Sequence, residues 1–129
     1  MQTIDIMVAI SLTDTDSEIP GGEISAEIVA DDEDSAIEAL KQLLTDFSAK
    51  GGRSYAVVGN EFFTDDSGND MVSVTIKLND IPEISWATFY YGLEDLGLDD
   101  PEDVDVTELA ARWINDFFDE DNEIVIEEI

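Results

Sequence analysis

Carboxylates are the only side chains numerous enough in this chain to dominate its chemistry. The sequence has 33 Asp and Glu against 5 Lys and Arg, no His and no Cys, and its formal net charge is −28. The commonest general base, the commonest metal ligand and the reactive thiol are therefore missing. Paired carboxylates can hydrolyse glycosides, but acidic sites that handle phosphates generally also need cations. We therefore expect no enzymatic activity and no cofactor.

Clustered Asp and Asn residues also raise the question of calcium binding. The segments "TDTDSE", "DDSGND" and "DEDNE" have the oxygen-ligand composition of calcium loops. None fits the EF-hand pattern. Counted from Asp65, position 6, where glycine is required, is Asp70, and position 12, where glutamate is required, is Ile76. Counted from Asp14, position 6 is Ile19. We expect no metal site.

The acids are crowded toward the carboxyl terminus. From Glu94 to Ile129 there are 15 acids and one base, Arg112. Spread over a folded protein of this mass, the net charge averages roughly one per 240 Å², against about one per 100 Å² for duplex DNA. Half of that charge gathered at one end approaches the duplex value. Such a surface repels nucleic acid and attracts basic proteins, so we expect no direct nucleic-acid binding.

Helical spacing brings some of these acids together. Glu108, Asp116 and Asp119 fall on or near one helix face at separations of roughly 5 to 12 Å, and Arg112 is predicted to pair with Glu108 or Asp116. The predicted partner-binding residues are the acids of this region, namely Glu94, Asp95, Asp99, Asp100, Glu102, Asp103, Asp105, Glu108, Asp116, Asp119, Glu120, Asp121 and Glu123.

Strands are predicted wherever apolar and polar residues alternate. The clearest alternation covers 3–12 and 23–30, two segments joined by a polar loop. A second hairpin is predicted from 55–64 and 71–78, because the turn-rich "DDSGND" separates them. The segment 123–129 is predicted to return as a terminal strand.

Helices are predicted from a period of 3.6 residues. The first runs through "DDEDSAIEALKQLLTDFSAKGG", opened by an Asp or Ser cap and closed by Gly51. A second helix is predicted over 82–96, where the residues are apolar on most sides. The third begins at Asp105, whose spacing to Glu108 indicates a capping box. The tryptophans and the pair Phe117 and Phe118 are expected in the core.

The predicted order is thus β-β-α-β-β-α-α-β, which indicates an α+β fold in one domain, 1–129. We expect a two-layer sandwich, with a mostly antiparallel sheet of about five strands and about three helices on one face. The amino-terminal segment lacks a signal-peptide pattern, and no apolar run approaches the roughly 18 residues of a membrane span. We therefore expect no membrane association and a cytoplasmic location, that of the host cell if the gene belongs to a phage.

In length, charge, lack of Cys and His, and mixed α/β pattern, the chain resembles the DNA-mimic inhibitors of phages and mobile elements, the anti-restriction and anti-CRISPR proteins. The resemblance covers the whole chain in composition and shares no motif, so it transfers no residue roles. It implies an acidic protein that occupies the nucleic-acid groove of a basic target such as a CRISPR effector or restriction enzyme.

Two other functions fit the same composition. An immunity protein or antitoxin that neutralises a basic nuclease toxin would use the same electrostatics and add an apolar hot spot. A domain adapted to a high-salt cytoplasm would need a hydrated negative surface for solubility alone. For the DNA-mimic inhibitor and for the immunity protein or antitoxin, the partner is a basic nucleic-acid-binding protein or complex. The oligomeric state stays open, a dimer included.

Overall fold

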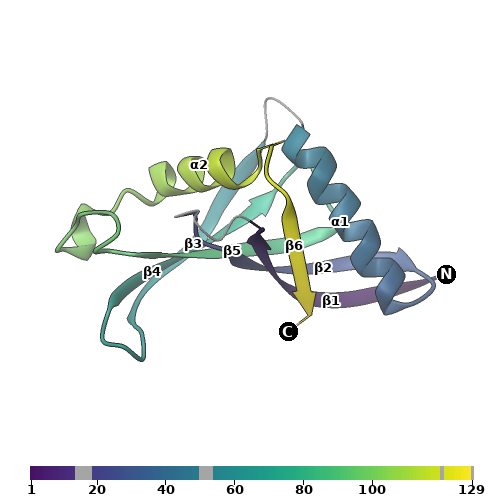
Figure 1. Ribbon diagram of the computed structural model, residues 1–129, viewed down its shortest axis with the longest axis horizontal. Helices are drawn as coiled ribbons and strands as arrows, with labels where there is room; N and C mark the ends of the chain where they lie inside the picture. The colour runs from purple at the N-terminus through teal and green to yellow at the C-terminus, as the bar shows by residue number, and fades with distance from the viewer. Residues whose placement is uncertain (14–18, 50–53, 120, 129) are drawn as a thin grey trace.

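A computed structural model describes residues 1–13, 19–49, 54–119 and 121–128 of the chain (Figure 1). Three residues discussed above lie outside these ranges: Gly51, the predicted end of the first helix, Asp14, the start of one calcium-loop comparison, and Glu120, a predicted partner-binding acid. The described part contains six strands, two α-helices and one short 3₁₀ helix. In chain order these are β1 (Gln2–Leu12), β2 (Gly22–Ala30), α1 (Glu33–Ala49), β3 (Tyr55–Thr64), β4 (Asp70–Leu78), β5 (Ile84–Gly92), η1 (Pro101–Asp103), α2 (Val106–Phe117) and β6 (Ile124–Glu128).

All six strands belong to one antiparallel sheet with the order β3-β4-β5-β2-β1-β6. The two predicted hairpins, β1–β2 and β3–β4, are confirmed, and β5 joins them side by side. The terminal strand β6 pairs with β1 and forms one edge of the sheet, while β3 forms the other. The predicted bounds of the first four strands agree with the structure to within one residue.

Both α-helices lie on the same face of the sheet (Figure 1). Helix α1 packs over β1, β2 and β6, and α2 packs over β3 and β4. Alternation along β1 explains this layering, because Ile6, Val8 and Ile10 are buried beneath the helices while Asp5 and Met7 are exposed on the other side. No described helix covers that other side, which is called the helix-free face below. The α+β two-layer arrangement is therefore confirmed.

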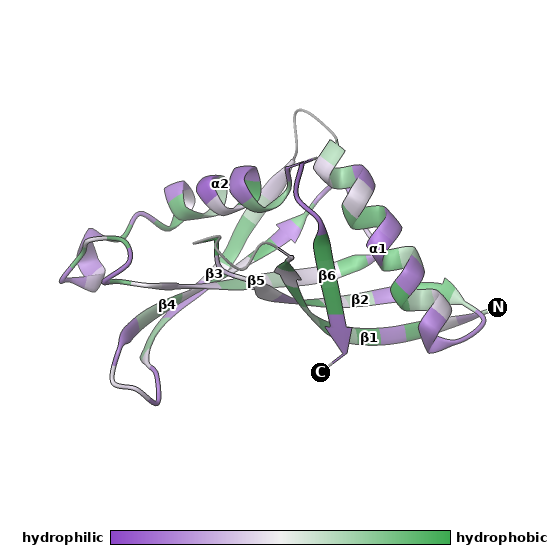
Figure 2. Ribbon diagram, viewed as in Figure 1, coloured by the Kyte–Doolittle hydropathy of each residue, from purple (hydrophilic) through white to green (hydrophobic). Residues whose placement is uncertain are grey.

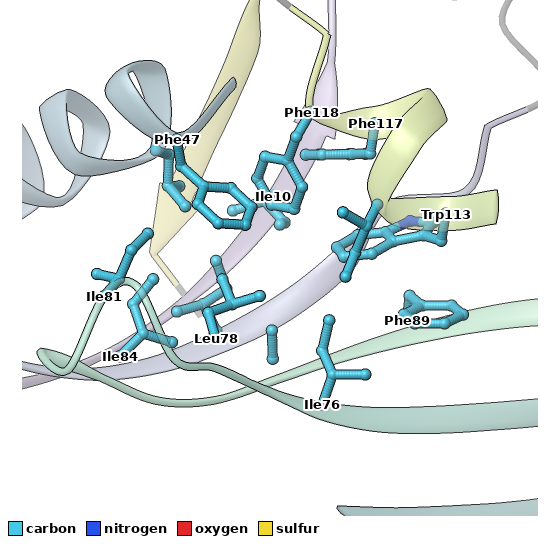
Figure 3. Close-up of a cluster of buried hydrophobic side chains, with 14 of the residues drawn as sticks. Ile10, Phe47, Ile76, Leu78, Ile81, Ile84, Phe89, Trp113, Phe117 and Phe118 are labelled. Carbon is cyan, nitrogen blue, oxygen red and sulfur yellow. The ribbon is translucent and has the colours of Figure 1, made fainter. Parts of the chain in front are cut away.

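Aromatic rings fill the core where the two helices meet (Figure 3). The Trp113 indole is fully buried and stacks on Phe89 of β5, with ring centroids 4.6 Å apart, and on Phe117 at 4.8 Å. Phe47 of α1 meets Phe118 edge to face at 4.8 Å. Hydrophobic residues of both helices face the sheet and hydrophilic ones face outward (Figure 2). The core positions predicted for Trp113, Phe117 and Phe118 are confirmed.

The helix predicted over 82–96 is wrong, because most of this segment is the central strand β5. Its pairing with β2 skips Ser85, so an extra residue shifts the alternation. As a result Ile84 is buried together with Ala87, Phe89 and Tyr91, and the spacing of three and seven residues from Ile84 to Ala87 and Tyr91 imitates one face of a helix. Trp86, which was predicted in the core, is instead half-buried on the helix-free face, where it pairs with Ser25. The structure therefore has six strands and two α-helices where about five and about three were predicted.

Candidate functional site: an acidic ridge along α2

The loop after β5 displays the first of the candidate acids. One helical turn begins at Leu93 and ends at Gly97, whose φ of 71° favours glycine. The amide of Leu98 donates to the carbonyl of Leu93 at 3.0 Å, and the amide of Gly97 donates to the carbonyl of Glu94 at 3.0 Å. These bonds satisfy the backbone, so Glu94, Asp95 and Asp99 project from the loop as exposed side chains.

Two acids on this loop also cap helices. The Asp100 carboxylate accepts the amide of Glu102 at 3.0 Å and starts η1, and the Asp105 carboxylate accepts the amide of Glu108 at 3.2 Å and starts α2. The N-cap predicted at Asp105 is thus confirmed. Carboxylates at these places satisfy orphan amides and face the positive ends of the helix dipoles. Part of the acidity here therefore has a purely structural cause.

The outer face of α2 carries the next charges in a row. Glu108, Arg112 and Asp116 follow one another at spacings of four residues, and all three are exposed. Helix α2 ends at Phe117, so Asp119, which was predicted on or near the same face, lies in the turn beyond the helix. Arg112 Nε lies 3.8 Å from Asp116 Oδ2, so of the two predicted partners, Glu108 and Asp116, it pairs with Asp116. Its guanidinium carbon lies 5.7 Å from the centre of the Tyr91 ring. The one cation of this region is thus already engaged within the protein.

The turn between α2 and β6 holds the last of the candidates. The Asp119 carboxylate accepts the amide of Asp121 at 3.0 Å, and the side-chain amide of Asn122 donates to the Asp116 carbonyl at 2.8 Å. The Glu123 carbonyl accepts the amide of Thr13 at 3.1 Å, which ties the turn to the end of β1. Asp119, Asp121 and Glu123 are exposed.

We call the twelve described candidates the acidic ridge, since Glu120 is outside the described residues. All twelve are exposed. They form two groups at the ends of α2, about 17 Å apart at the 1.5 Å rise of a helix, and the row on the outer face of α2 connects them. The structure therefore places the predicted site residues in two groups at the ends of α2 instead of one compact cluster, with Glu108 and Asp116 between the groups.

Acids also lie outside the ridge. Asp5, Glu23, Glu27 and Glu61 belong to the helix-free face, where Lys77 also lies, and Asp65 with Asp66 marks the β3–β4 turn. In that turn the amides of Asn69 and Ser67 bond Asp65 and lower the pKa of its carboxyl group. The described surface is thus acidic outside the ridge as well as along it.

Removing the Asp105 cap gives the first testable expectation. The substitution Asp105→Ala is expected to lower the free energy of unfolding by about 1 kcal/mol, the usual value of an N-cap. Urea unfolding monitored by circular dichroism measures the change. Asp103→Ala is the matched control, because it removes an equal charge from an exposed residue two positions away. Equal effects of the two substitutions would contradict a capping role for Asp105.

Two carboxylates of like charge face each other between β6 and the start of α1. The Glu33 carboxylate, with a smaller contribution from burial, raises the pKa of Glu128 above its ordinary value of 4.5. The ionised form of Glu128 is therefore disfavoured in the folded protein. Stability linked to this group is present below the unfolded pKa and is lost as pH rises through the folded pKa.

Glu128→Gln is therefore expected to raise the melting temperature at pH 7, and the gain is expected to shrink as pH falls toward 4.5, where the carboxyl group becomes protonated. Calorimetry across this pH range measures it. Glu127→Gln, one residue earlier, is the control. A gain for Glu128→Gln that does not depend on pH would show that repulsion from Glu33 is not its cause.

The described residues contain no group of three or more carboxylates placed to hold a metal ion. None of the described helices is both long enough and apolar enough to cross a bilayer. Comparison with known proteins yields no family model, no curated protein and no solved structure that matches the chain.

Sequence reasoning missed two exposed aromatic residues beside the ridge. Phe62 and Phe63, near the end of β3, are 40% and 38% exposed. With Met71, Leu93 and Pro101 they line a hollow of about 200 Å³. The signal in the sequence is the doublet itself, because adjacent residues of a strand point to opposite faces and only one of the two can face the core.

Proposed function

We propose that the acidic ridge binds the nucleic-acid groove of a basic protein and excludes the polynucleotide from it. The protein would act as a DNA mimic and would have no catalytic role. Its target is then a nucleic-acid-binding protein or complex, with CRISPR effectors and restriction enzymes as the leading classes.

The observation that supports this proposal most is the exposure of all twelve ridge acids, together with the pairing of Arg112 to Asp116. Hydrogen bonds to Asp100, Asp105 and Asp119 hold three of these carboxylates in fixed positions while leaving them exposed. A polyanion whose charges are already fixed loses less conformational entropy on binding than a disordered acidic tail.

The mechanism is electrostatic. Like-charged side chains at the two ends of α2 produce a field that accelerates encounter with a basic groove at low salt. In the complex, Lys and Arg of the target exchange phosphates for carboxylates, so affinity falls as salt rises. Repulsion among the unbound carboxylates adds to the driving force, because cations of the target relieve it.

The test is affinity capture on the immobilised protein from a lysate of the cell that carries the gene, followed by elution with duplex DNA. Polyglutamate at equal charge concentration is the matched eluent. We expect the captured proteins to bind nucleic acid and to be released by DNA at lower charge concentration than by polyglutamate. Capture of a small nuclease toxin would assign the protein as an antitoxin. Captured proteins that DNA does not release would contradict the proposal.

The acids outside the ridge favour a second candidate function, a housekeeping domain whose acidity serves solubility at high salt. Asp5 and Glu27, for instance, are paired directly across β1 and β2 on the helix-free face, where like charges repel. A domain of this kind would fold only in molar salt and would not compete with DNA. Melting temperatures in NaCl, KCl and CaCl₂ at equal ionic strength separate this function from the first and from calcium binding.

A further inference from the structure

Two adjoining hollows lie between the β3–β4 turn and the loop after β5. The first is lined by two polar residues, Thr64 and Asp70, and by five apolar ones, Phe62, Phe63, Met71, Leu93 and Pro101. The second, about 500 Å³, shares Leu93 and Asp70 with the first and extends to Asp99. The amide of Leu93 donates to the carbonyl of Asp70 at 3.0 Å, which holds the two segments together. We call the combined feature the aromatic groove; the segments that form it lie at the left of Figure 1.

The groove exposes aromatic surface that the fold does not use. Among the described residues, Phe62 and Phe63 are the only exposed aromatic side chains, and every other ring is buried or half-buried. Phe63 has one ring neighbour, Tyr90, at 6.1 Å in an edge-to-face arrangement. Both phenylalanines lie on the edge strand β3, so a partner can approach them without displacing another strand. Their side chains point to opposite faces of the sheet, because Phe62 pairs with the buried Val72 and Phe63 with Met71. The ring on the helix-bearing side is that of Phe62.

The charges at the rim of the groove all have one sign. Asp70, Glu94 and Asp99 line the hollows, and Asp95 belongs to the same loop. No Lys or Arg lines either hollow within the described part of the chain. A second copy of this chain would bring another net charge of −28 against this rim, which charge repulsion opposes. Charge complementarity therefore selects a cationic occupant.

We propose that the aromatic groove binds an arginine side chain on the basic surface of the partner. This inference rests on the proposed function and adds the contact that gives it chemical selectivity. Guanidinium is planar and weakly hydrated, so it stacks on a phenyl face while its N–H groups pair with carboxylates. A lysine ammonium is a strongly hydrated point charge that matches the acids but uses the ring face less well. The ridge supplies attraction, and the groove distinguishes arginine from lysine.

Capped hexaarginine and hexalysine peptides are the probes, with affinities measured by isothermal titration calorimetry at low and at physiological salt. The wild-type chain is expected to prefer hexaarginine by about 2- to 5-fold, the effect of one exposed cation–π contact. Phe62→Ala and Phe62→Leu are both expected to abolish this preference, and the second keeps apolar volume at the site. Val58→Ala is the matched control, because Val58 lies on the same strand and is 60% exposed outside the groove.

The outcomes separate the two proposals. If the wild-type chain binds both peptides equally, or if Phe62→Leu keeps the preference, the groove does not select arginine, while the acidic ridge is unaffected. If neither peptide binds at low salt, the ridge itself fails as a polyanion and the groove fails with it. A dimer that dissociates only in the Phe62 variants would place a second copy in the groove and overturn the inference.

Discussion

Replacing Asp99, Asp103, Asp121 and Glu123 by Lys is expected to weaken binding to the captured basic protein by roughly 100-fold or more. All four are exposed ridge acids, and they lie at both ends of α2. Each substitution turns an attraction into a repulsion where the target is most positive. The free energy of unfolding is expected to stay the same or rise, because repulsion among neighbouring carboxylates decreases. Binding is measured by surface plasmon resonance, and stability by urea unfolding.

The matched control places the same charge change elsewhere. Asp5, Glu23, Glu27 and Glu61 lie on the helix-free face, and their replacement by Lys alters net charge equally. We expect a smaller loss that physiological salt largely screens. Asp100, Asp105 and Asp119 are left unchanged, because their carboxylates cap backbone amides. If both quadruple variants lose affinity equally, net charge alone matters and the ridge has no special role.

Trp113→Ala is expected to lower the free energy of unfolding by about 3 to 5 kcal/mol, the usual cost of removing a buried aromatic side chain. The indole is fully buried between Phe89 and Phe117, and its Nε1 donates to the carbonyl of Pro20 at 2.8 Å. It therefore holds α2, and the ridge on its outer face, against the sheet. Unfolding in urea at several salt concentrations measures the loss. Urea is used because guanidinium chloride is itself a salt and would screen the charge repulsion.

Trp113→Phe is the control for this prediction. It keeps an aromatic ring beside Phe89 but removes the donor to Pro20, so a smaller loss of about 1 to 3 kcal/mol is expected. If Trp113→Ala unfolds at nearly the wild-type urea concentration, the helix is held mainly by other contacts. Loss of partner binding in that variant would then point to local disorder of the ridge.

The sequence predicted those elements whose signals are local. Helix α2 follows from the Asp105 cap and its apolar stripe, and β1 to β4 follow from alternation, because each of these patterns lies within one element. Strand β5 could not be predicted in the same way. Its extra residue at Ser85 shifts the alternation, and the outward positions that follow carry the aromatic residues Trp86 and Tyr90, so the segment looks apolar on most sides. Pairing with β2 and β4 on both sides shows that it is a strand.

The candidate site was predictable in composition but not in arrangement. Exposure of the ridge acids follows from their charge, whereas their separation into two groups follows from the length of α2. The aromatic groove depends on the approach of Leu93 to Asp70, a contact between segments distant in the sequence. The doublet of Phe62 and Phe63 indicates that one of the two rings points away from the core, but no local pattern reveals the groove beside it.

A competition titration tests the central claim most directly. A labelled DNA duplex is bound to the captured basic protein, and its fluorescence anisotropy is followed as the acidic protein is added. Competition for one groove predicts complete release, with the half-point rising in proportion to total DNA concentration, and no release by the quadruple Lys variant of the ridge. A stable ternary complex, in which the duplex and the acidic protein are bound together, would contradict it.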